Sequence, residues 1–298
     1  RSLIARPRLG ARLGHLSQPA SGWLGCAMGL ETRLVQRWLL HCGIRRAAGA
    51  GRDEDDLVAR PEADGAWEGA RANQLGEQWY MASEAGFSLG LWPGQNGQVG
   101  AFPEQGTNWR WLRSACEASP RRIRVLNLFG YTGGSSLACL ASRNADVTHL
   151  DGARAAVSRA RSNAELSGLS GEPVRWIVDD ALTYVRRAAR RGERYDGIVL
   201  DPPAFGRGAK REWRIDRDLP LLSGLLAEVL SDDPSFVLLS AHDPRWPVAA
   251  LDGQLREITR GASAVRGRCE RDEMLLRARG GGRDLPMGVY SRWAAGTV

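Results

Sequence analysis

The feature that most constrains the fold is a regular alternation of short apolar runs and helix-like segments between residues 121 and 240. Five runs have the length and apolar content of buried strands, at 123–129, 147–150, 174–178, 195–200 and 236–240. The segments between them have helical spacing or composition, at 135–142, 153–167, 181–191 and 219–230. Strands that alternate with helices form βαβ units, so the pattern predicts an α/β fold around a mostly parallel sheet.

The two ends of this region differ from its middle. Residues 264–269, 273–277 and 287–293 look like strands with no helix between them, and we expect them to close the sheet in antiparallel fashion. Residues 65–112 are rich in glycine and tryptophan, with short runs between turn residues, which predicts short antiparallel strands. We interpret the tryptophans as packing residues, with a base-stacking surface as the alternative. The predicted domains are therefore 1–50, 51–115 (a small N-terminal β extension) and 116–298.

Residues 1–50 carry the whole net charge of the protein. The chain has 41 basic and 34 acidic side chains, and this segment holds eight arginines against the single acid Glu31. The remainder is neutral, so the basic balance is no general argument for nucleic-acid binding. An arginine-rich segment almost free of acids is typical of an organellar transit peptide, which predicts a mitochondrial location and, less favoured, a plastid one. The alternatives are a basic arm that lies on a large organellar assembly and a structureless tail.

Composition argues against several other classes of protein. A length of 298 residues allows one large α/β domain or two small ones. The five cysteines include no close pair, which argues against a disulfide framework and a zinc ribbon, and we predict no metal site. No apolar run reaches the ~18 residues that a membrane-spanning helix needs, so we expect no membrane span.

The notable motifs all follow predicted strands. In an open parallel sheet, ligands bind beyond the carboxyl ends of the strands. A glycine loop follows the first strand, an acid follows each of the second and third, and a double proline with an aromatic residue follows the fourth. In order along the chain these are Gly130-Tyr131-Thr132-Gly133-Gly134, Asp151, Asp180-Ala181 and Asp201-Pro202-Pro203-Ala204-Phe205.

Each motif has a binding interpretation and a structural one. The glycine loop lets the backbone approach a ligand, yet it matches neither the dinucleotide nor the phosphate-loop pattern, and it can be a simple tight turn. Asp151 can accept hydrogen bonds from both hydroxyls of a ribose, and Asp180 from an adenine amino group. Either acid can instead cap the helix that follows it.

The double proline is the most specific single signal. Pro202 and Pro203 would fix a rigid, extended exit that holds Asp201 toward a planar substrate or a transferring group, with a structural turn as the alternative. Further upstream, Phe102, Gln105 and Asn108 have a spacing that could bring an aromatic ring and two amides to one face of a turn. Taken alone, that segment would be interpreted as a loop.

The four motifs in this order resemble those of the class I S-adenosylmethionine-dependent methyltransferases. The stretches 126–134, 150–169, 176–208 and 285–293 are similar to those of one group, the relatives of bacterial large-subunit rRNA cytosine carbon-5 methyltransferases. The resemblance covers about residues 75–295. It implies a Rossmann-like sheet of seven strands, mostly parallel with an antiparallel C-terminal strand, and S-adenosyl-L-methionine as cofactor.

The resemblance also implies roles for individual residues. Asp151 would hold the ribose, and Asp180 and Ala181 would meet the adenine. Asp201 would lie near the sulfonium and the substrate, in a catalytic motif that includes Pro202, Pro203 and Phe205. The residues along the methionine portion would be Phe129, Gly130, Tyr131, Thr132 and Gly133, and those covering the cofactor would be Phe102, Gln105 and Asn108.

The sequence departs from that family at the nucleophile. In that family the nucleophilic cysteine follows the fifth strand. This chain has Ser240-Ala241-His242-Asp243 there, and neither Cys139 nor Cys269 matches the cysteine in position. We therefore do not transfer carbon-5 chemistry, which needs a thiol to activate the ring. His242 could act as a base, although a loop histidine often has no such role. The double-proline motif also resembles those of enzymes that methylate exocyclic amines. The RNA-binding PUA domain of the family has no counterpart in residues 1–50.

These observations favour an organellar methyltransferase that acts on RNA, with rRNA as the expected substrate. Phosphate contacts are expected from Arg207, Lys210, Arg211 and Arg214, which follow the double proline, or from the arginines of 186–191 on a helix. The alternative is a methyltransferase-derived structural or assembly subunit of a large mitochondrial complex such as the mitoribosome. A third, weaker interpretation is methylation of a protein or a small molecule by the same fold.

Overall fold

A computed structural model describes residues 45–46, 79–92, 99–207, 212–262, 265, 267–276 and 283–296. The chain divides into two compact units, and nearly all predicted site residues fall in the larger one. The smaller unit comprises Arg1–Ser83, Ser88–Pro103 and Leu276–Leu285, and the larger Glu84–Phe87, Glu104–Leu275 and Pro286–Val298. The predicted leader lies outside the described residues apart from β1 (Arg45–Arg46). The predicted domain boundaries stay predictions.

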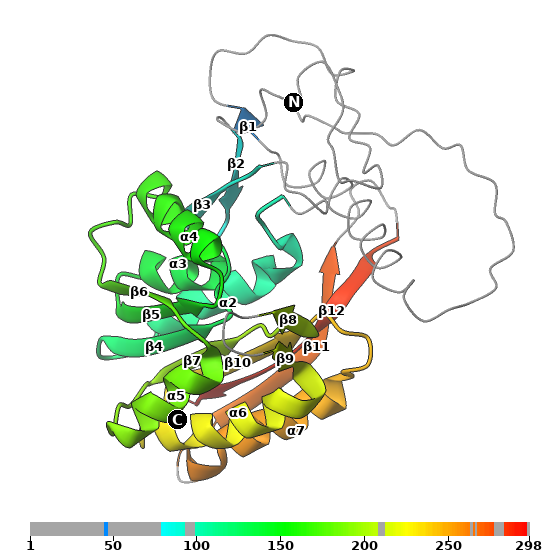
Figure 1. The fold of residues 1–298 in the computed structure, drawn as a ribbon. Coiled ribbons are helices and arrows are strands. Elements are labelled where there is room, and N and C mark those ends of the chain that lie inside the picture. Colours follow the sequence, from blue (N-terminus) through cyan, green and yellow to red (C-terminus); the bar gives the residue numbers. More distant parts are fainter. Residues whose placement is uncertain are drawn as a thin grey trace, which may run out of the picture. The chain divides into compact units, whose positions relative to one another are not determined.

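The larger unit is built around the seven-stranded sheet that the sequence predicts (Figure 1). Its strands lie in the order β11-β12-β10-β7-β4-β5-β6. β10, β7, β4, β5 and β6 run parallel to one another, and β12 runs antiparallel to β10. The strands are β4 (Ile123–Leu128), β5 (Ala145–Asp151), β6 (Val174–Val178), β7 (Gly197–Leu200), β10 (Phe236–Ala241), β11 (Gly267–Leu276) and β12 (Leu285–Ala295).

Helices cover both faces of this sheet (Figure 1). α5, α6 and α7 pack against one another on one face, and α2 packs against α3 on the other. The helices are α2 (Gly106–Glu117), α3 (Gly134–Ala141), α4 (Arg154–Leu166), α5 (Ala181–Arg190), α6 (Ile215–Val229) and α7 (Val248–Ile258). No helix in the described part of the chain is long and apolar enough to cross a membrane.

The core explains why the central strands lack polar alternation. Every residue of β7 and β10 is buried, because both faces of the sheet carry helices. α5 shows the complementary pattern, with Leu182 and Val185 buried and Arg186 exposed. One apolar cluster connects α5, α6 and α7 to the strands between them. This rigid layer fixes where each strand ends.

The sequence predictions were wrong or incomplete at several elements. Residues 109–112, at the end of the segment expected to form short strands, belong to helix α2, and α7 was not predicted. α6 begins at Ile215, where the prediction had 219, and β11 is one strand where two were expected. The short strands predicted upstream are present as β2 (Trp79–Ser83) and β3 (Phe87–Gly90), which form a small sheet with β1 in the order β1-β2-β3.

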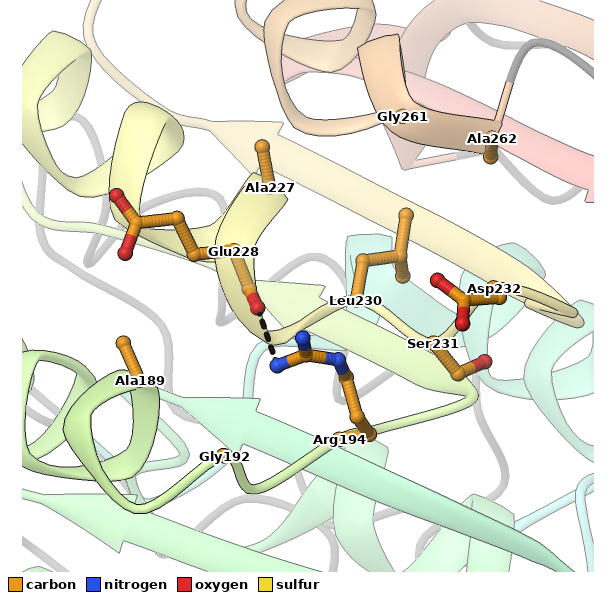
Figure 2. A pocket seen from close by; sticks show the side chains of 10 residues that line it. All are labelled: Ala189, Gly192, Arg194, Ala227, Glu228, Leu230, Ser231, Asp232, Gly261 and Ala262. Carbon is orange, nitrogen blue, oxygen red and sulfur yellow. Dashed lines mark hydrogen bonds between the residues drawn. The ribbon is translucent and has the colours of Figure 1, made fainter.

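A cavity of about 350 Å³ lies at the amino-terminal edge of the parallel strands (Figure 2). Its walls come from the ends of α5 and α6, the segments that lead into β7 and β10, and the short turn Arg260–Ala262. Arg194 lies across it and donates to the Glu228 carbonyl at 2.7 Å. Because ligands of parallel sheets bind at the opposite edge, this cavity is not the predicted site.

Candidate functional site

The glycine loop between β4 and α3 has its shape fixed by two different constraints. Gly133 precedes α3 with a φ of 97°, a left-handed conformation that favours glycine. Gly130 is required by packing, since a Cβ there would lie 2.4 Å from Cε1 of His149. The Gly130 N–H donates to the Leu150 carbonyl at 3.0 Å. The loop is therefore attached to the end of β5.

Two bulky residues of this loop hold unusual backbone angles. Phe129 has a φ of 56° and Tyr131 a φ of 46°, where side chains with a Cβ are seldom found. The Phe129 ring packs against Trp213 at 4.7 Å between centroids. The Tyr131 N–H donates to Oδ2 of Asp151 at 2.9 Å. Backbone strain held by such contacts is common at ligand-binding loops.

Asp151 ends β5 and connects two segments of backbone. It accepts from the N–H of Tyr131 and, at 2.8 Å, from the N–H of Ala153. The residue that caps α4 is Ala153, with no side-chain bond, so Asp151 does not fill the helix-capping role considered above. Burial raises the pKa of Asp151, and the two backbone hydrogen bonds oppose that rise. Its role toward a ribose stays a prediction.

A buried polar chain beneath the loop escaped the sequence analysis. Asn127 donates to Ser136 Oγ at 2.8 Å, and that hydroxyl lies 2.9 Å from Nδ1 of His149. Burial lowers the pKa of His149 to about 4, so its imidazole is neutral near pH 7. The only available sequence signal was two polar residues, Asn127 and His149, in otherwise apolar strands.

Asp180 fills the structural role that the sequence left open. Its Oδ1 accepts from both the backbone N–H and the hydroxyl of Thr183, each at 2.8 Å, which caps the first turn of α5. Ala181 is the first residue of that helix and is buried. Asp179, the residue before it, pairs with Arg187. Contact of Asp180 and Ala181 with an adenine stays a prediction.

The double proline leads from β7 into a hairpin of β8 (Phe205–Arg207) and β9 (Glu212–Arg214). The Trp213 indole N–H donates to the Pro203 carbonyl at 2.8 Å, and Trp213 is buried. The hairpin therefore fixes the path of the chain just after Asp201. Phe205 is 46% exposed beside this exit. Lys210 and Arg211 lie outside the described residues.

Asp201 accepts hydrogen bonds from two side chains. Gln105 Nε2 donates to its Oδ2 at 2.9 Å, and Ser240 Oγ donates to its Oδ1 at 2.8 Å. The same Gln105 nitrogen lies 2.9 Å from Ser240 Oγ. Gln105 immediately precedes α2 and Ser240 lies on β10, so elements far apart in sequence orient one carboxylate.

His242 lies between two carboxylates. Its Nε2 is 3.4 Å from Asp201 Oδ1, and its Nδ1 is 3.4 Å from Glu104 Oε1 and 2.9 Å from the Met287 carbonyl. Burial would lower the pKa of His242, but Asp201 and Glu104 raise it to about 10. Burial likewise opposes ionisation of Asp201, yet His242, Ser240 and Gln105 bring its pKa below the usual value. A pKa this high favours the imidazolium near neutral pH and disfavours the role of a base, which the sequence had left open.

The spacing of Gln105 and Asn108 predicted their proximity correctly. Asn108 Nδ2 donates to Gln105 Oε1 at 2.8 Å, and both side chains are buried. They stand at the start of a helix where a turn was expected. Phe102 belongs to the smaller unit and is half-buried. Direct contact of these three residues with a cofactor stays a prediction.

The strand order, the antiparallel β12 and the motifs at successive strand ends define a Rossmann-like fold of the class I methyltransferase type. The sequence pattern of the S-adenosylmethionine-dependent methyltransferase family matches residues 33–265. The chain belongs to this family. The resemblance inferred from the sequence is thereby confirmed.

Several known proteins are similar to this chain. The SAM-dependent methyltransferase from Agrobacterium tumefaciens, known from a crystal structure, shares 36% sequence identity with this chain. The two structures superpose with a TM-score of 0.73 over 80% of this chain and 77% of that one. Ribosomal RNA large subunit methyltransferase I of Klebsiella pneumoniae (strain 342) is 40% identical over 28% of this chain. Ribosomal RNA large subunit methyltransferase K/L of Shewanella sp. (strain ANA-3) is 33% identical over 38% of this chain. The matches span only 20% and 16% of these two curated relatives.

The residues at the strand ends suit S-adenosylmethionine, the cofactor of this family. Asp151 presents a largely buried carboxylate, which suits a ribose diol, beside a loop whose backbone is held in strained angles. Asp201 is kept ionised at the end of β7, and a fixed negative charge suits a sulfonium cation. The donor set and the loop therefore fit the cofactor.

The described cysteines lie away from this cluster. Cys116 and Cys139 are buried in α2 and α3, and Cys269 is exposed on β11. The contact with Cys116, together with burial, raises the pKa of the Cys139 thiol. The segment after β10, where a carbon-5 enzyme carries its thiol, presents the positively charged His242 here.

Proposed function

We propose that this protein transfers the methyl group of S-adenosylmethionine to RNA, with large-subunit ribosomal RNA as the substrate. One observation carries the proposal: Asp201, at the end of β7, is an ionised carboxylate fixed by Gln105, Ser240 and His242. A scaffold protein gains nothing from a charged cluster held this tightly at a strand end. The names of the curated relatives support RNA as the substrate class.

Each part of the site has a defined task in this proposal. The loop from Phe129 to Gly133 runs along the methionine portion, Asp151 binds the ribose hydroxyls, and α5 begins beside the adenine. The cofactor supplies a methyl group on a positively charged sulfur. Asp201 orients the acceptor in line with that methyl group, and its charge favours the approach. Positioning and electrostatics of this kind account for most of the rate enhancement in such transfers.

The site also restricts the acceptor atom. A ring carbon must first be activated by a thiolate, and the segment that follows β10 begins His242-Asp243 with no cysteine. The acceptor we propose is therefore an atom with a lone pair of its own. The acceptor's lone pair takes the methyl group as the methyl–sulfur bond breaks, and the acceptor then loses a proton to solvent. Asp201 accepts a hydrogen bond from the acceptor group and, because its pKa is lowered, does not retain that proton.

The β8–β9 hairpin is the proposed RNA-contacting surface. Phe205 is exposed next to the site and can stack on a nucleobase, and Arg207 and Arg214 flank it on the two paired strands. Lys210 and Arg211 would extend the basic segment. Arginine side chains at this place would bind phosphates and set the position of the RNA without reading its sequence.

A mitochondrial location is part of the proposal. It is supported by the arginine-rich, acid-poor composition of residues 1–50. Fusion of these residues to a fluorescent reporter tests it. Import with cleavage supports a transit peptide, whereas a cytosolic or nuclear reporter contradicts it.

Calorimetric titration of S-adenosylmethionine into the full chain tests the activity, with Asp151→Ala as the site variant. Asp146→Ala is the matched control, because Asp146 lies on the same strand but at its other end and is exposed. We expect the wild-type protein and Asp146→Ala to bind S-adenosylmethionine and Asp151→Ala not to bind it. In a separate assay, the wild-type protein should transfer labelled methyl groups to large-subunit RNA. A folded protein that binds no cofactor would instead be a structural or assembly subunit.

A further inference from the structure

Arg292 is a buried cation on β12, behind the cluster around Asp201. It is 8% exposed and lies between the rings of Trp111 and Tyr290, at 4.7 and 4.8 Å from their centroids. Glu270 on β11 accepts two hydrogen bonds from it, at 2.6 and 3.0 Å. This ion pair with two ring contacts balances the charge and fixes the plane of the guanidinium.

One arm of the guanidinium points away from Glu270 toward the site. Arg292 Nη1 donates to Asn108 Oδ1 at 3.3 Å, and Asn108 Nδ2 donates to Gln105 Oε1 at 2.8 Å. Gln105 Nε2 then donates to Asp201 Oδ2 at 2.9 Å. A continuous chain of hydrogen bonds therefore runs from β12 through the start of α2 to the carboxylate at the end of β7.

Arg292, the first residue in this series of hydrogen bonds, determines which way each amide donates. A guanidinium has donors only, so the oxygen of Asn108 must face Arg292 and its nitrogen must face Gln105. The oxygen of Gln105 is then occupied, and its nitrogen is turned to Asp201. If both amides were reversed, Gln105 would present its oxygen to an ionised carboxylate, and Asn108 would present its NH₂ to a cation. Both contacts would be repulsive.

We propose that Arg292 is a positioning residue for methyl transfer, which selects one orientation of the two amides and so keeps a donor on Asp201. The inference rests on the proposed function, because Asp201 is the group that orients the acceptor. Arg292 touches neither reacting partner in this scheme. It acts through Asn108 and Gln105: it holds the Asn108 oxygen, which leaves the Asn108 nitrogen to bind the Gln105 oxygen, and so adds to the preference that Asp201 itself imposes on Gln105.

A double-mutant cycle on the full-length protein tests the activity side of the proposal. Arg292→Met removes the donor and keeps an unbranched apolar side chain, and Gln105→Met removes the last member of the chain. We expect each to lower kcat by about 10- to 100-fold, the range typical of a misplaced catalytic group. The Kd for S-adenosylmethionine should change by less than about twofold in Arg292→Met. The double variant should be no slower than Gln105→Met alone.

Two further variants separate positioning from stability. Arg121→Met removes an arginine paired with the buried carboxylate of Asp196, at the other end of the sheet, and should leave kcat unchanged. Arg292→Lys keeps a donor-only cation and should recover part of the lost kcat. The positioning role would be refuted if the double variant lost kcat by the product of the two single losses. It would also be refuted if the loss of kcat correlated with the fall in melting temperature across all variants.

A second readout needs neither cofactor nor RNA. The ¹³C carboxyl signal of Asp201 reports its pKa, which depends on Gln105 and on the charged groups that face it, His242 and, beyond it, Glu104. With those groups unchanged, Arg292→Met should raise that pKa, whereas Arg121→Met should not. An unaltered titration would overturn the inference. If Arg292→Met raises the pKa of Asp201 but the wild-type protein transfers no methyl group, the proposed function is wrong, and the effect of Arg292 on Asp201 is still supported.

Discussion

At the scale of single residues, the site depends on groups buried beneath it as much as on those that face a ligand. Gly130 has no left-handed φ, yet it is required because His149 fills the space where a Cβ would stand. His149 cannot move aside freely, since Ser136 binds its Nδ1 and it is fully buried. The glycine loop thus owes its position to a neutral histidine on the next strand.

Gly130→Ala should therefore destabilise the protein by about 1–3 kcal/mol, the usual cost of overpacking a buried site. Urea unfolding measures the difference. Gly253→Ala is the control, because Gly253 lies inside helix α7, where an added methyl group would meet nothing within 4 Å. That change should stabilise the protein by about 0.5–1 kcal/mol through helix propensity. Equal effects of the two substitutions would contradict the packing argument.

His242 gives the stability a specific pH dependence. Its pKa rises from the ordinary 6.5 to about 10 on folding, so the folded protein holds this proton more tightly than the unfolded chain. The stabilisation is complete below about pH 6.5 and is lost as the pH rises through 10. The groups responsible are Asp201 and Glu104, and the neighbouring Asp243 is paired with Arg245.

Comparison with His242→Gln tests this pH dependence. The difference in free energy of unfolding between the two proteins should be largest near pH 6 and should shrink toward pH 10. Urea titrations at pH 6, 8 and 10 provide the measurement. A difference that stays constant over this range would show that folding does not shift the pKa of His242.

At the scale of elements, the sequence was informative where a strand or helix has a regular period. The central strands β7 and β10 are buried on both faces, and α5 alternates buried and exposed positions, so both were predictable. α2 was missed because glycine and tryptophan suggested strands, although Trp109, Leu112 and Cys116 lie on one helical face. α7 contains Gly253 and follows Pro247, which weakened its helical signal.

The site was predictable in part for the same reason. Strand ends locate Asp151 and Asp201, because parallel strands meet one edge of the sheet. The contact between Arg292 and Asn108 was not predictable, because the two residues are 184 positions apart. Only the folded chain brings β12 behind the start of α2. The spacing of Gln105 and Asn108 was the one local signal.

The cap of α5 allows the two roles of Asp180 to be separated. Asp180→Ala should cost about 1 kcal/mol of stability through loss of the bonds to Thr183. Asp180→Asn keeps a capping acceptor and should cost less than about 0.5 kcal/mol. Thermal unfolding gives these values, and calorimetry gives cofactor affinity for the same proteins. If Asp180→Ala melts earlier but binds S-adenosylmethionine normally, the residue is a helix cap and nothing more.

At the scale of the whole molecule, the separation of charge bears on how RNA is held. Residues 1–50 account for the net charge of +7, and the remainder is neutral. If the leader is a transit peptide, RNA is bound by local arginines, and the leader's charge contributes nothing to affinity. If it is a basic arm, its arginines neutralise phosphates and release counterions.

The salt dependence of RNA binding distinguishes the two roles. We expect the slope of log Kd against log salt to be the same for the full chain and for a variant with the eight leader arginines changed to glutamine. Each phosphate contact contributes about 0.7 to 0.9 to that slope, so loss of even three contacts would be measurable by filter binding or fluorescence anisotropy. A slope that falls by two or more in the variant would identify residues 1–50 as an RNA-binding arm. The hairpin of β8 and β9 would then supply only part of the interface.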